Sequence, residues 1–218
     1  MNKPLLIIGN KNYSSWSLRA WLMLKHAEVD FEELRVALQV PGYQLKLSYF
    51  SPSGKVPAYR VGDLTVWDTL SIAEYLYETH PALWPVDKSA RAIARSISAE
   101  MHSGFAAMRK AMPMNIRRRG RHVVSSPELE IDIARIKIIW RDLRTQYAEV
   151  GPWLFGEYSI ADAMFAPVVL RFLTYGVSEQ GVVQAYMEAV LNDPFMQEWV
   201  RASELEQEVV VPYEVGIS

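Results

Sequence analysis

The pattern of apolar and polar positions changes about one third of the way along the chain. In the first 79 residues, short apolar runs alternate with stretches of helical spacing, which predicts the order βαβ, a connecting segment and then ββα. Beyond residue 88 the apolar residues recur at helical spacing, and no strand is predicted. This order indicates an α/β N-terminal domain followed by an all-α C-terminal domain.

Prolines set the boundary between these two parts. The segment His80–Pro85 (HPALWP) cannot continue a helix, so we predict a domain at 1–79, a linker at 80–88 and a helical domain at 89–218. The predicted strands are 4–9, 31–38, the end of 51–62, and 64–67; the predicted helices are 16–27, 69–78, 89–110, 128–149, 160–173, 182–191 and 194–202. The apolar tail that follows, interrupted by Pro212 and Gly216, is predicted to dock as coil.

Composition narrows the class of protein. The chain has no cysteine, which excludes disulfides, cysteine nucleophiles and thiolate metal sites and suits a reducing compartment. The formal net charge of −2 argues against attraction of the whole protein to nucleic acid. The run Leu5–Ile8 is too short for a signal peptide, and no apolar stretch reaches the roughly 18 residues of a membrane span. We therefore expect a cytoplasmic protein with no metal, nucleic-acid or membrane partner.

The first candidate for chemistry is the run Tyr13–Arg19 (YSSWSLR), between the first strand and the first helix. A helix start offers unpaired N–H groups and a positive dipole end, and a serine hydroxyl adds a donor to an anion placed there. Such an arrangement can favour a thiolate, which is the nucleophilic form of a thiol. The run is explained equally well if Ser14 or Ser15 merely caps the helix.

Two further runs carry weaker signals of their own. In Gly54–Pro57 (GKVP), proline opens a strand, which favours a cis Val56–Pro57 bond that would leave the Val56 backbone free to pair with a peptide ligand. Lys55 there can hold a carboxylate. In the run Val66–Ile72 (VWDTLSI), Asp68 and Thr69 precede a helix and can bind the α-amino and α-carboxyl groups of an amino acid, although helix capping alone also explains them.

Taken together, these runs resemble the cytosolic glutathione transferases over nearly the whole chain. The resemblance implies a thioredoxin-like N-terminal domain that binds glutathione as co-substrate and a helical domain that supplies the second-substrate pocket. By the same resemblance Lys55 contacts the glycyl end, Val56 and Pro57 the cysteinyl part, and Asp68 with Thr69 the γ-glutamyl group. The family usually has Glu-Ser at the last pair, where this chain has Asp-Thr. The resemblance also implies a homodimer, formed between the N-terminal domain of one subunit and the helical domain of the other, that acts in detoxification.

The serine run is most similar to the zeta-like branch, whose pattern is Ser-Ser-Cys-Ser-Trp-Arg. That branch assigns its first serine, here Ser14, to the glutathione sulfur; Ser15 is then a helix cap or an alternative donor. Trp16 and Leu18 depart from the branch pattern. Three functions stay open: a transferase acting on a small electrophile, a glutathione-dependent isomerase of the maleylacetoacetate type, and a non-enzymatic module with the same fold.

The helical half contributes two further predictions. The loop 109–122 carries six basic residues between Arg109 and Arg121 and no acidic one, so it is either solvated surface or part of a pocket that prefers anionic electrophiles. The second-substrate pocket is predicted from the following residues, which at helical spacing also suit a core: Met101, Phe105, Met108, Arg109 and Met112. Ser159 and Asp162 have capping-box spacing and resemble the buried folding motif of the family, so we assign them to structure.

Overall fold

The first part of the chain forms a four-stranded mixed sheet in the computed structural model, which describes residues 3–217. The strands are β1 (Leu5–Ile8), β2 (Glu32–Arg35), β3 (Ala58–Val61) and β4 (Leu64–Trp67), in the spatial order β2-β1-β3-β4. Strand β1 is parallel to β2, with Leu5 beside Glu32, and antiparallel to β3, with Leu6 beside Tyr59. Strand β4 returns antiparallel to β3 through the turn at Gly62.

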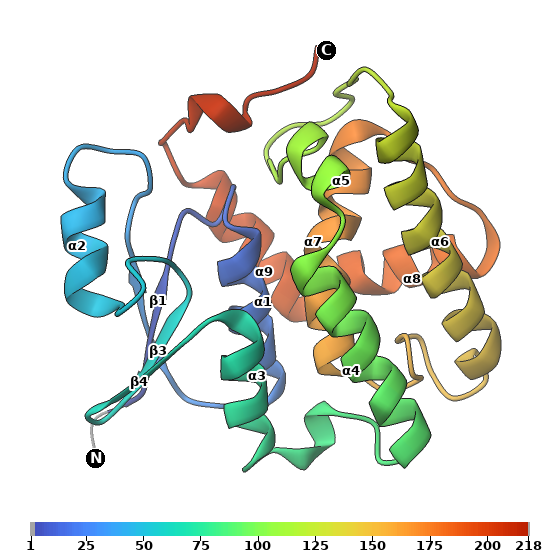
Figure 1. Ribbon diagram of the computed structural model, residues 1–218, viewed down its shortest axis with the longest axis horizontal. Helices are drawn as coiled ribbons and strands as arrows, with labels where there is room; N and C mark the ends of the chain where they lie inside the picture. Colours follow the sequence, from blue (N-terminus) through green and yellow to red (C-terminus); the bar gives the residue numbers. More distant parts are fainter. Residues whose placement is uncertain (1–2, 218) are drawn as a thin grey trace.

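Helices cover both faces of this sheet (Figure 1). Successive side chains of a strand point to opposite faces. Leu6 and Ile8 accordingly join the core beneath α1 (Ser15–His26) and α3 (Thr69–Tyr77), whereas Ile7 packs with Leu47 of α2 (Tyr43–Phe50) on the other face. Helix α2 was missing from the prediction, which treated this stretch as a connecting segment. The remaining order, βαβ and then ββα, is confirmed.

The second part of the chain is helical, as predicted (Figure 1). Its elements are α4 (Lys88–Ser103), α5 (Ala106–Ala111), α6 (Pro127–Tyr147), α7 (Ile160–Tyr175), α8 (Gly181–Asn192) and α9 (Pro194–Glu204), with short 3₁₀ turns η1 (Pro81–Leu83) and η2 (Val211–Tyr213). The single helix predicted at 89–110 is wrong, because the chain breaks after Ser103. Phe105 has a left-handed φ of 59°, and a Cβ on Gly104 would lie 2.8 Å from the Glu100 carbonyl oxygen. The break separates α5 from α4.

Helix α7 lies at the centre of the molecule and packs against α1, α4 and α8. It is buried along nearly its whole length, as expected for a helix that is apolar on all sides. Its start is a capping box in which the Asp162 carboxylate accepts hydrogen bonds from the Ser159 N–H (2.9 Å), the Ser159 hydroxyl (3.0 Å) and the Leu154 N–H (2.9 Å). Burial raises the pKa of Asp162 to about 6. The contact of α1 with α7 joins the two parts of the chain in one core.

The tail after α9 crosses back over the start of α1 and ends beside the loop that follows α5 (Figure 1). Apart from η2 it has no regular helix or strand up to residue 217. Within residues 3–217, no helix combines the length and apolar character needed to cross a bilayer.

Candidate functional site

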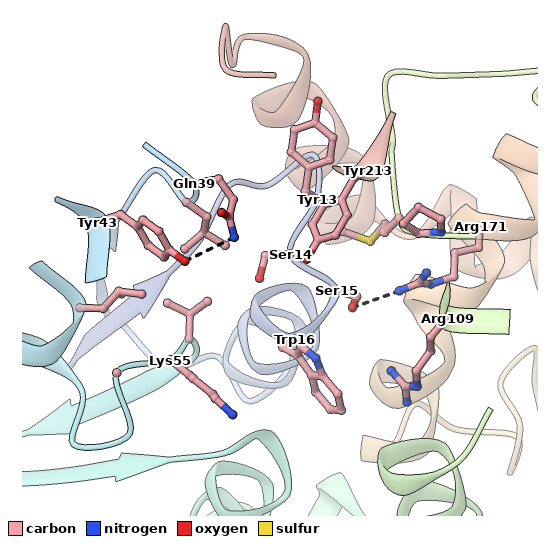
Figure 2. A pocket seen from close by; sticks show the side chains of 16 residues that line it. Tyr13, Ser14, Ser15, Trp16, Gln39, Tyr43, Lys55, Arg109, Arg171 and Tyr213 are labelled. Atoms are coloured by element: carbon pink, nitrogen blue, oxygen red, sulfur yellow. Dashed lines mark hydrogen bonds between the residues drawn. The ribbon is translucent and has the colours of Figure 1, made fainter. Parts of the chain in front are cut away.

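A cavity of about 490 Å³ opens over the start of α1, where the sheet and the helical part meet (Figure 2). The segments that form it lie far apart in the sequence: the β1–α1 loop, the β2–α2 loop with α2, the segment before β3, α5 with the loop after it, α7 and the tail. The cavity is lined by Tyr13, Ser14, Ser15, Trp16, Leu38, Gln39, Tyr43, Leu47, Gly54, Lys55, Val56, Arg109, Pro113, Met114, Arg171 and Tyr213.

Ser14 is the N-cap of α1. Its Oγ accepts a hydrogen bond from the Ser17 N–H (3.3 Å) and lies 2.7 Å from the Ser17 Oγ, which in turn accepts from the Gly9 N–H (3.0 Å). The structure thus assigns the cap to Ser14, whereas the sequence left it open between Ser14 and Ser15. When the Ser17 hydroxyl donates to Ser14, the Ser14 proton is free to donate into the cavity.

Ser15, the first residue of α1, is held from the opposite side of the cavity. Its Oγ accepts a hydrogen bond from the guanidinium of Arg171 on α7, at 3.3 Å. A second nitrogen of Arg171 donates to the Met112 carbonyl oxygen. Burial, together with the charge of Arg109, lowers the pKa of Arg171 to about 10. Figure 2 shows Ser15 pointing toward Arg171, while Ser14 lies on the side of Gln39 and Tyr43.

Trp16 lies between two more arginines. The guanidinium carbon of Arg19 is 4.5 Å from the centre of the indole ring and that of Arg109 is 4.9 Å from it, both within cation–π range. Arg19 is buried, donates to the Met164 carbonyl oxygen (2.8 Å), and has its pKa lowered by burial and by the two neighbouring arginines. This end of the cavity is therefore electropositive.

A second cavity, of about 410 Å³, adjoins the first across Trp16, Lys55 and Val56. It brings together all five residues predicted to bind glutathione, and its lining is Trp16, Ser53, Lys55, Val56, Pro57, Trp67, Asp68, Thr69 and His102. The Val56–Pro57 peptide bond is cis, which confirms that prediction. The Thr69 hydroxyl donates to the Trp16 carbonyl oxygen at 3.5 Å, a long contact that links α3 to the start of α1.

Asp68 caps α3 from a left-handed backbone conformation, with φ of 72°. One of its carboxylate oxygens accepts from the Leu70 N–H (2.9 Å), and the other lies 3.3 Å from the Nε2 of His102 on α4. His102 also contacts the Trp16 ring edge-on, at 5.1 Å between ring centres. The helical part thus reaches the cavity that the sequence placed in the N-terminal domain alone.

The predicted second-substrate residues divide into two groups. Arg109 lines the first cavity. The four apolar side chains, by contrast, are at most 7% exposed, belong to the main core and do not line either cavity: Met101, Phe105, Met108 and Met112. They hold α4 and α5 in place, and Met114, further along the chain, is the methionine that faces the cavity.

Most arginines of the loop 109–122 are bound within the protein. Arg117 donates to the carbonyl oxygens of Glu206 and Glu208 (2.6 Å to Glu208), and Arg118 pairs with the Glu214 carboxylate at 2.9 Å. Arg121 donates to the Gly216 carbonyl oxygen at 2.9 Å. The basic loop therefore fastens the tail.

Glutamates of the tail complete this attachment from the other side. The Glu206 carboxylate accepts from the Lys11 and Asn12 N–H groups (2.7 and 3.0 Å), and the Tyr13 hydroxyl donates to Glu214 (2.7 Å). These contacts place Tyr213 in the cavity wall.

Several lining residues escaped the sequence analysis: Gln39, Tyr43, His102, Arg171 and Tyr213. Arg171 carried a signal, since it is a single cation in the apolar run Ala163–Leu173. Tyr43 follows Pro41-Gly42 and begins the helix that was missed. No group of three metal-ligating side chains that could hold an ion occurs within residues 3–217.

Comparisons with known proteins show what the N-terminal part of the chain is similar to. Residues 13–79 match the family model described as glutathione S-transferase, N-terminal domain. Among curated sequences, a probable maleylacetoacetate isomerase of Caenorhabditis elegans is 39% identical over 105 residues, 47% of this chain and 48% of that protein. Maleylacetoacetate isomerase of Mus musculus is 36% identical over 108 residues, 47% of this chain and 49% of that protein. The match thus spans about half the length of these relatives.

Solved structures share the fold over nearly the whole chain. A glutathione transferase homolog from Burkholderia with bound glutathione superposes with a TM-score of 0.70 at 24% identity, covering 94% of this chain and 99% of the other. A Tau class glutathione S-transferase from mango superposes with a TM-score of 0.67 at 18% identity, covering 93% and 96%.

Proposed function

We propose that this chain, whose residues 13–79 match the N-terminal domain of glutathione S-transferases and which shares the fold of solved glutathione transferases, activates the thiol of glutathione for attack on a small electrophile. One observation carries the proposal. Residues of three separate segments, the β1–α1 loop, the segment before β3 and the start of α3, line two adjoining cavities that meet at Trp16, Lys55 and Val56. A tripeptide with a thiol at its centre has the length and the polar groups to bridge them.

The proposed placement of glutathione follows from the chemistry of each wall. The exposed amine of Lys55 suits the glycyl carboxylate, and the Val56 backbone suits the cysteinyl residue. At the start of α3, the Asp68 carboxylate suits the γ-glutamyl ammonium, and the Thr69 hydroxyl with the helix dipole suits the α-carboxylate. The thiol then lies over the start of α1.

We propose that Ser14 donates the hydrogen bond that favours the thiolate. Its oxygen has the Ser17 N–H and the Ser17 hydroxyl as neighbours, and a hydroxyl has one proton to give. With the Gly9 N–H donating to Ser17 and Ser17 donating to Ser14, the Ser14 proton points to the ligand. Each unit by which the thiol pKa falls corresponds to about 1.4 kcal/mol in favour of the anion.

A second candidate function is glutathione-dependent cis–trans isomerisation of a maleylacetoacetate-like substrate. The observation that favours it is the name of the relatives, which are 36–39% identical over about half of this chain. At the start of α1, Trp16 and Leu18 differ from the residues that the zeta-like branch has at these positions. Because the branch pattern is incomplete, the transferase and isomerase activities need separate assays.

The test is calorimetric titration with glutathione, followed by assays of the bound enzyme against a panel of neutral and anionic electrophiles and against maleylacetoacetate. We expect binding, and we expect Lys55→Ala to weaken it about tenfold through loss of one charge contact. Lys46→Ala is the control, because Lys46 is an exposed lysine of α2 that lines neither cavity. Absence of glutathione binding by the wild-type protein would leave the non-enzymatic module as the explanation of the fold.

A homodimer and a cytoplasmic location belong to the same proposal. Apolar side chains are exposed on β4 and α4, the elements that face away from the tail in Figure 1: Leu64 (50%), Trp67 (45%) and Ile93 (45%). A second copy that covers them would remove this apolar surface from water. Light scattering should then give about twice the 24.9 kDa mass of one chain.

A further inference from the structure

Arg171 is a buried cation at the wall of the first cavity, and no carboxylate within residues 3–217 lies within ion-pair distance (4.0 Å) of it. It is 6% exposed and makes two hydrogen bonds, to the Met112 carbonyl oxygen and to the Ser15 Oγ (3.3 Å). Both partners are neutral. A buried charge without a counter-charge is costly, and an anion bound in the cavity would offset that cost.

The groups around Arg171 strengthen this electropositive field. The charge of Arg109 on α5 acts on Arg171, and the charges of Arg109 and Arg171 both act on Arg19 of α1. Within the part of the chain that the structure describes, no carboxylate acts on Arg19 or Arg171, and the one that acts on Arg109 is Asp132 of α6.

The hydrogen bond to Ser15 has a direction that is fixed by chemistry. A guanidinium only donates, so the Ser15 oxygen must accept, and the single proton of the Ser15 hydroxyl is left to donate elsewhere. The Ser15 side chain lines the cavity next to Ser14, at the positive end of α1. Arg171 therefore orients a second donor toward the place where the proposed function puts sulfur.

We propose that Arg171 is a positioning residue that stabilises the thiolate of bound glutathione through Ser15 and through its own charge. This inference rests on the proposed function and adds a cation from the helical part of the chain to the serine of the N-terminal part. The alternative, that Arg171 holds an anionic group of the electrophile, fits its position less well. Its second hydrogen bond anchors it to the main chain, and Arg109 stands closer to Trp16.

The experiment measures the pKa of bound glutathione from the pH dependence of thiolate absorbance. We expect Arg171→Gln, whose amide can still donate to Ser15, to raise this pKa by about one pH unit, since a unit charge several ångströms away contributes an effect of that order. Arg171→Lys should recover most of the shift, because it restores the charge. Ser15→Ala should raise the pKa by less, and the double variant Ser15→Ala/Arg171→Gln should shift it by less than the sum of the two.

Arg144→Gln is the matched control. Arg144 on α6 is also 6% exposed and also donates to main-chain carbonyl oxygens, those of Trp153 and Gly151, but it lines neither cavity. It should cost comparable folding stability and leave the thiol pKa unchanged. A thiol pKa unchanged in Arg171→Gln with glutathione still bound would overturn the inference, as would an equal shift in Arg144→Gln. So would a rise confined to the KM of anionic electrophiles. Failure of the wild-type protein to bind glutathione would instead contradict the proposed function.

Discussion

Helices α1 and α7 both begin at a serine cap, and they differ at the third residue of the first turn. In α7 that residue is Asp162, whose carboxylate accepts three hydrogen bonds at the helix start. In α1 it is Ser17, and the first turn contains no acidic side chain. The start of α7 thus has a buried carboxylate of its own chain. The start of α1 instead faces a cavity and has the Arg171 guanidinium beside it.

The difference teaches how the same local chemistry serves stability or binding. A helix N-terminus favours a negative charge wherever it lies. When the chain supplies the charge, the helix start is satisfied and becomes a fixed point of the fold. When the chain has no acidic side chain at the helix start and a cavity lies in front of it, the helix N-terminus can favour a negatively charged ligand.

We expect the largest effect from a substitution at the start of α7, where it lowers the stability of the fold. Asp162→Ala removes an acceptor from two buried N–H groups and one hydroxyl, so we expect a loss of about 3 kcal/mol in the free energy of unfolding, measured by denaturant titration. Asp87→Ala is the control, because Asp87 caps α4 at an exposed site through one bond to the Ala90 N–H. It should cost about 1 kcal/mol. Equal losses in the two variants would contradict the structural role of Asp162.

The contribution of Asp162 should also depend on pH. Its pKa is about 6 in the folded protein, raised by burial from an ordinary 3.8, so the folded state holds this proton more tightly than the unfolded chain. The resulting stabilisation is complete below about pH 4 and is lost as the pH rises through about 6. The difference in unfolding free energy between wild type and Asp162→Ala should therefore shrink over that interval.

We expect the next largest effect from a substitution at the start of α1, where it lowers the rate of turnover. Ser14→Ala removes the proposed donor to the thiolate, so we expect turnover to fall on the order of 100-fold and the pKa of bound glutathione to rise. It should also cost about 1 kcal/mol of stability, because Ser14 is the cap. Ser126→Ala is the control: Ser126 caps α6 through the Leu129 N–H, away from either cavity, and its loss should affect stability alone.

The smallest of the three effects concerns the orientation of the Ser14 hydroxyl. Ser17→Ala leaves Ser14 in place but removes the hydroxyl that we expect to donate to it, so turnover should fall about tenfold with glutathione affinity nearly unchanged. Ser203→Ala, at a fully buried serine of α9, controls for loss of a buried hydroxyl. Steady-state kinetics of both variants give the comparison; a larger loss in Ser17→Ala than in Ser14→Ala would mean that Ser17 itself contacts the ligand.

The parts of the fold that the sequence predicts well are those with local causes. The apolar run at β1, the serines before α1 and the prolines around η1 each determine their own element. The missed helix α2 had a signal too, with Tyr43, Leu47 and Phe50 at helical spacing after Pro41-Gly42, but it is short and only Leu47 is buried. The break between α4 and α5 depends on Gly104, whose close approach to Glu100 is a property of the packed structure.

The candidate site divides in the same way. Lys55, Val56, Asp68 and Thr69 occur in short runs with recognisable turn and cap chemistry, and the structure brings them to one cavity. The cavity residues that the helical part contributes could not be predicted from short sequence runs. Whether a methionine of 101–114 faces the core or the cavity depends on how α5 turns, and the bonds of Arg117 to the tail join residues about 90 positions apart.

Trp16 gives the molecule a built-in optical probe. Its indole borders both cavities and is flanked by two cations and an imidazole, whereas three of the other six tryptophans, Trp84, Trp140 and Trp199, are at most 1% exposed. A ligand that binds in either cavity changes the polarity and the quenching groups around Trp16, and Trp67, which lines the second cavity, responds to that cavity as well. Emission intensity can therefore follow occupancy in real time without a label, and Trp16→Phe identifies the part of the signal that comes from the site.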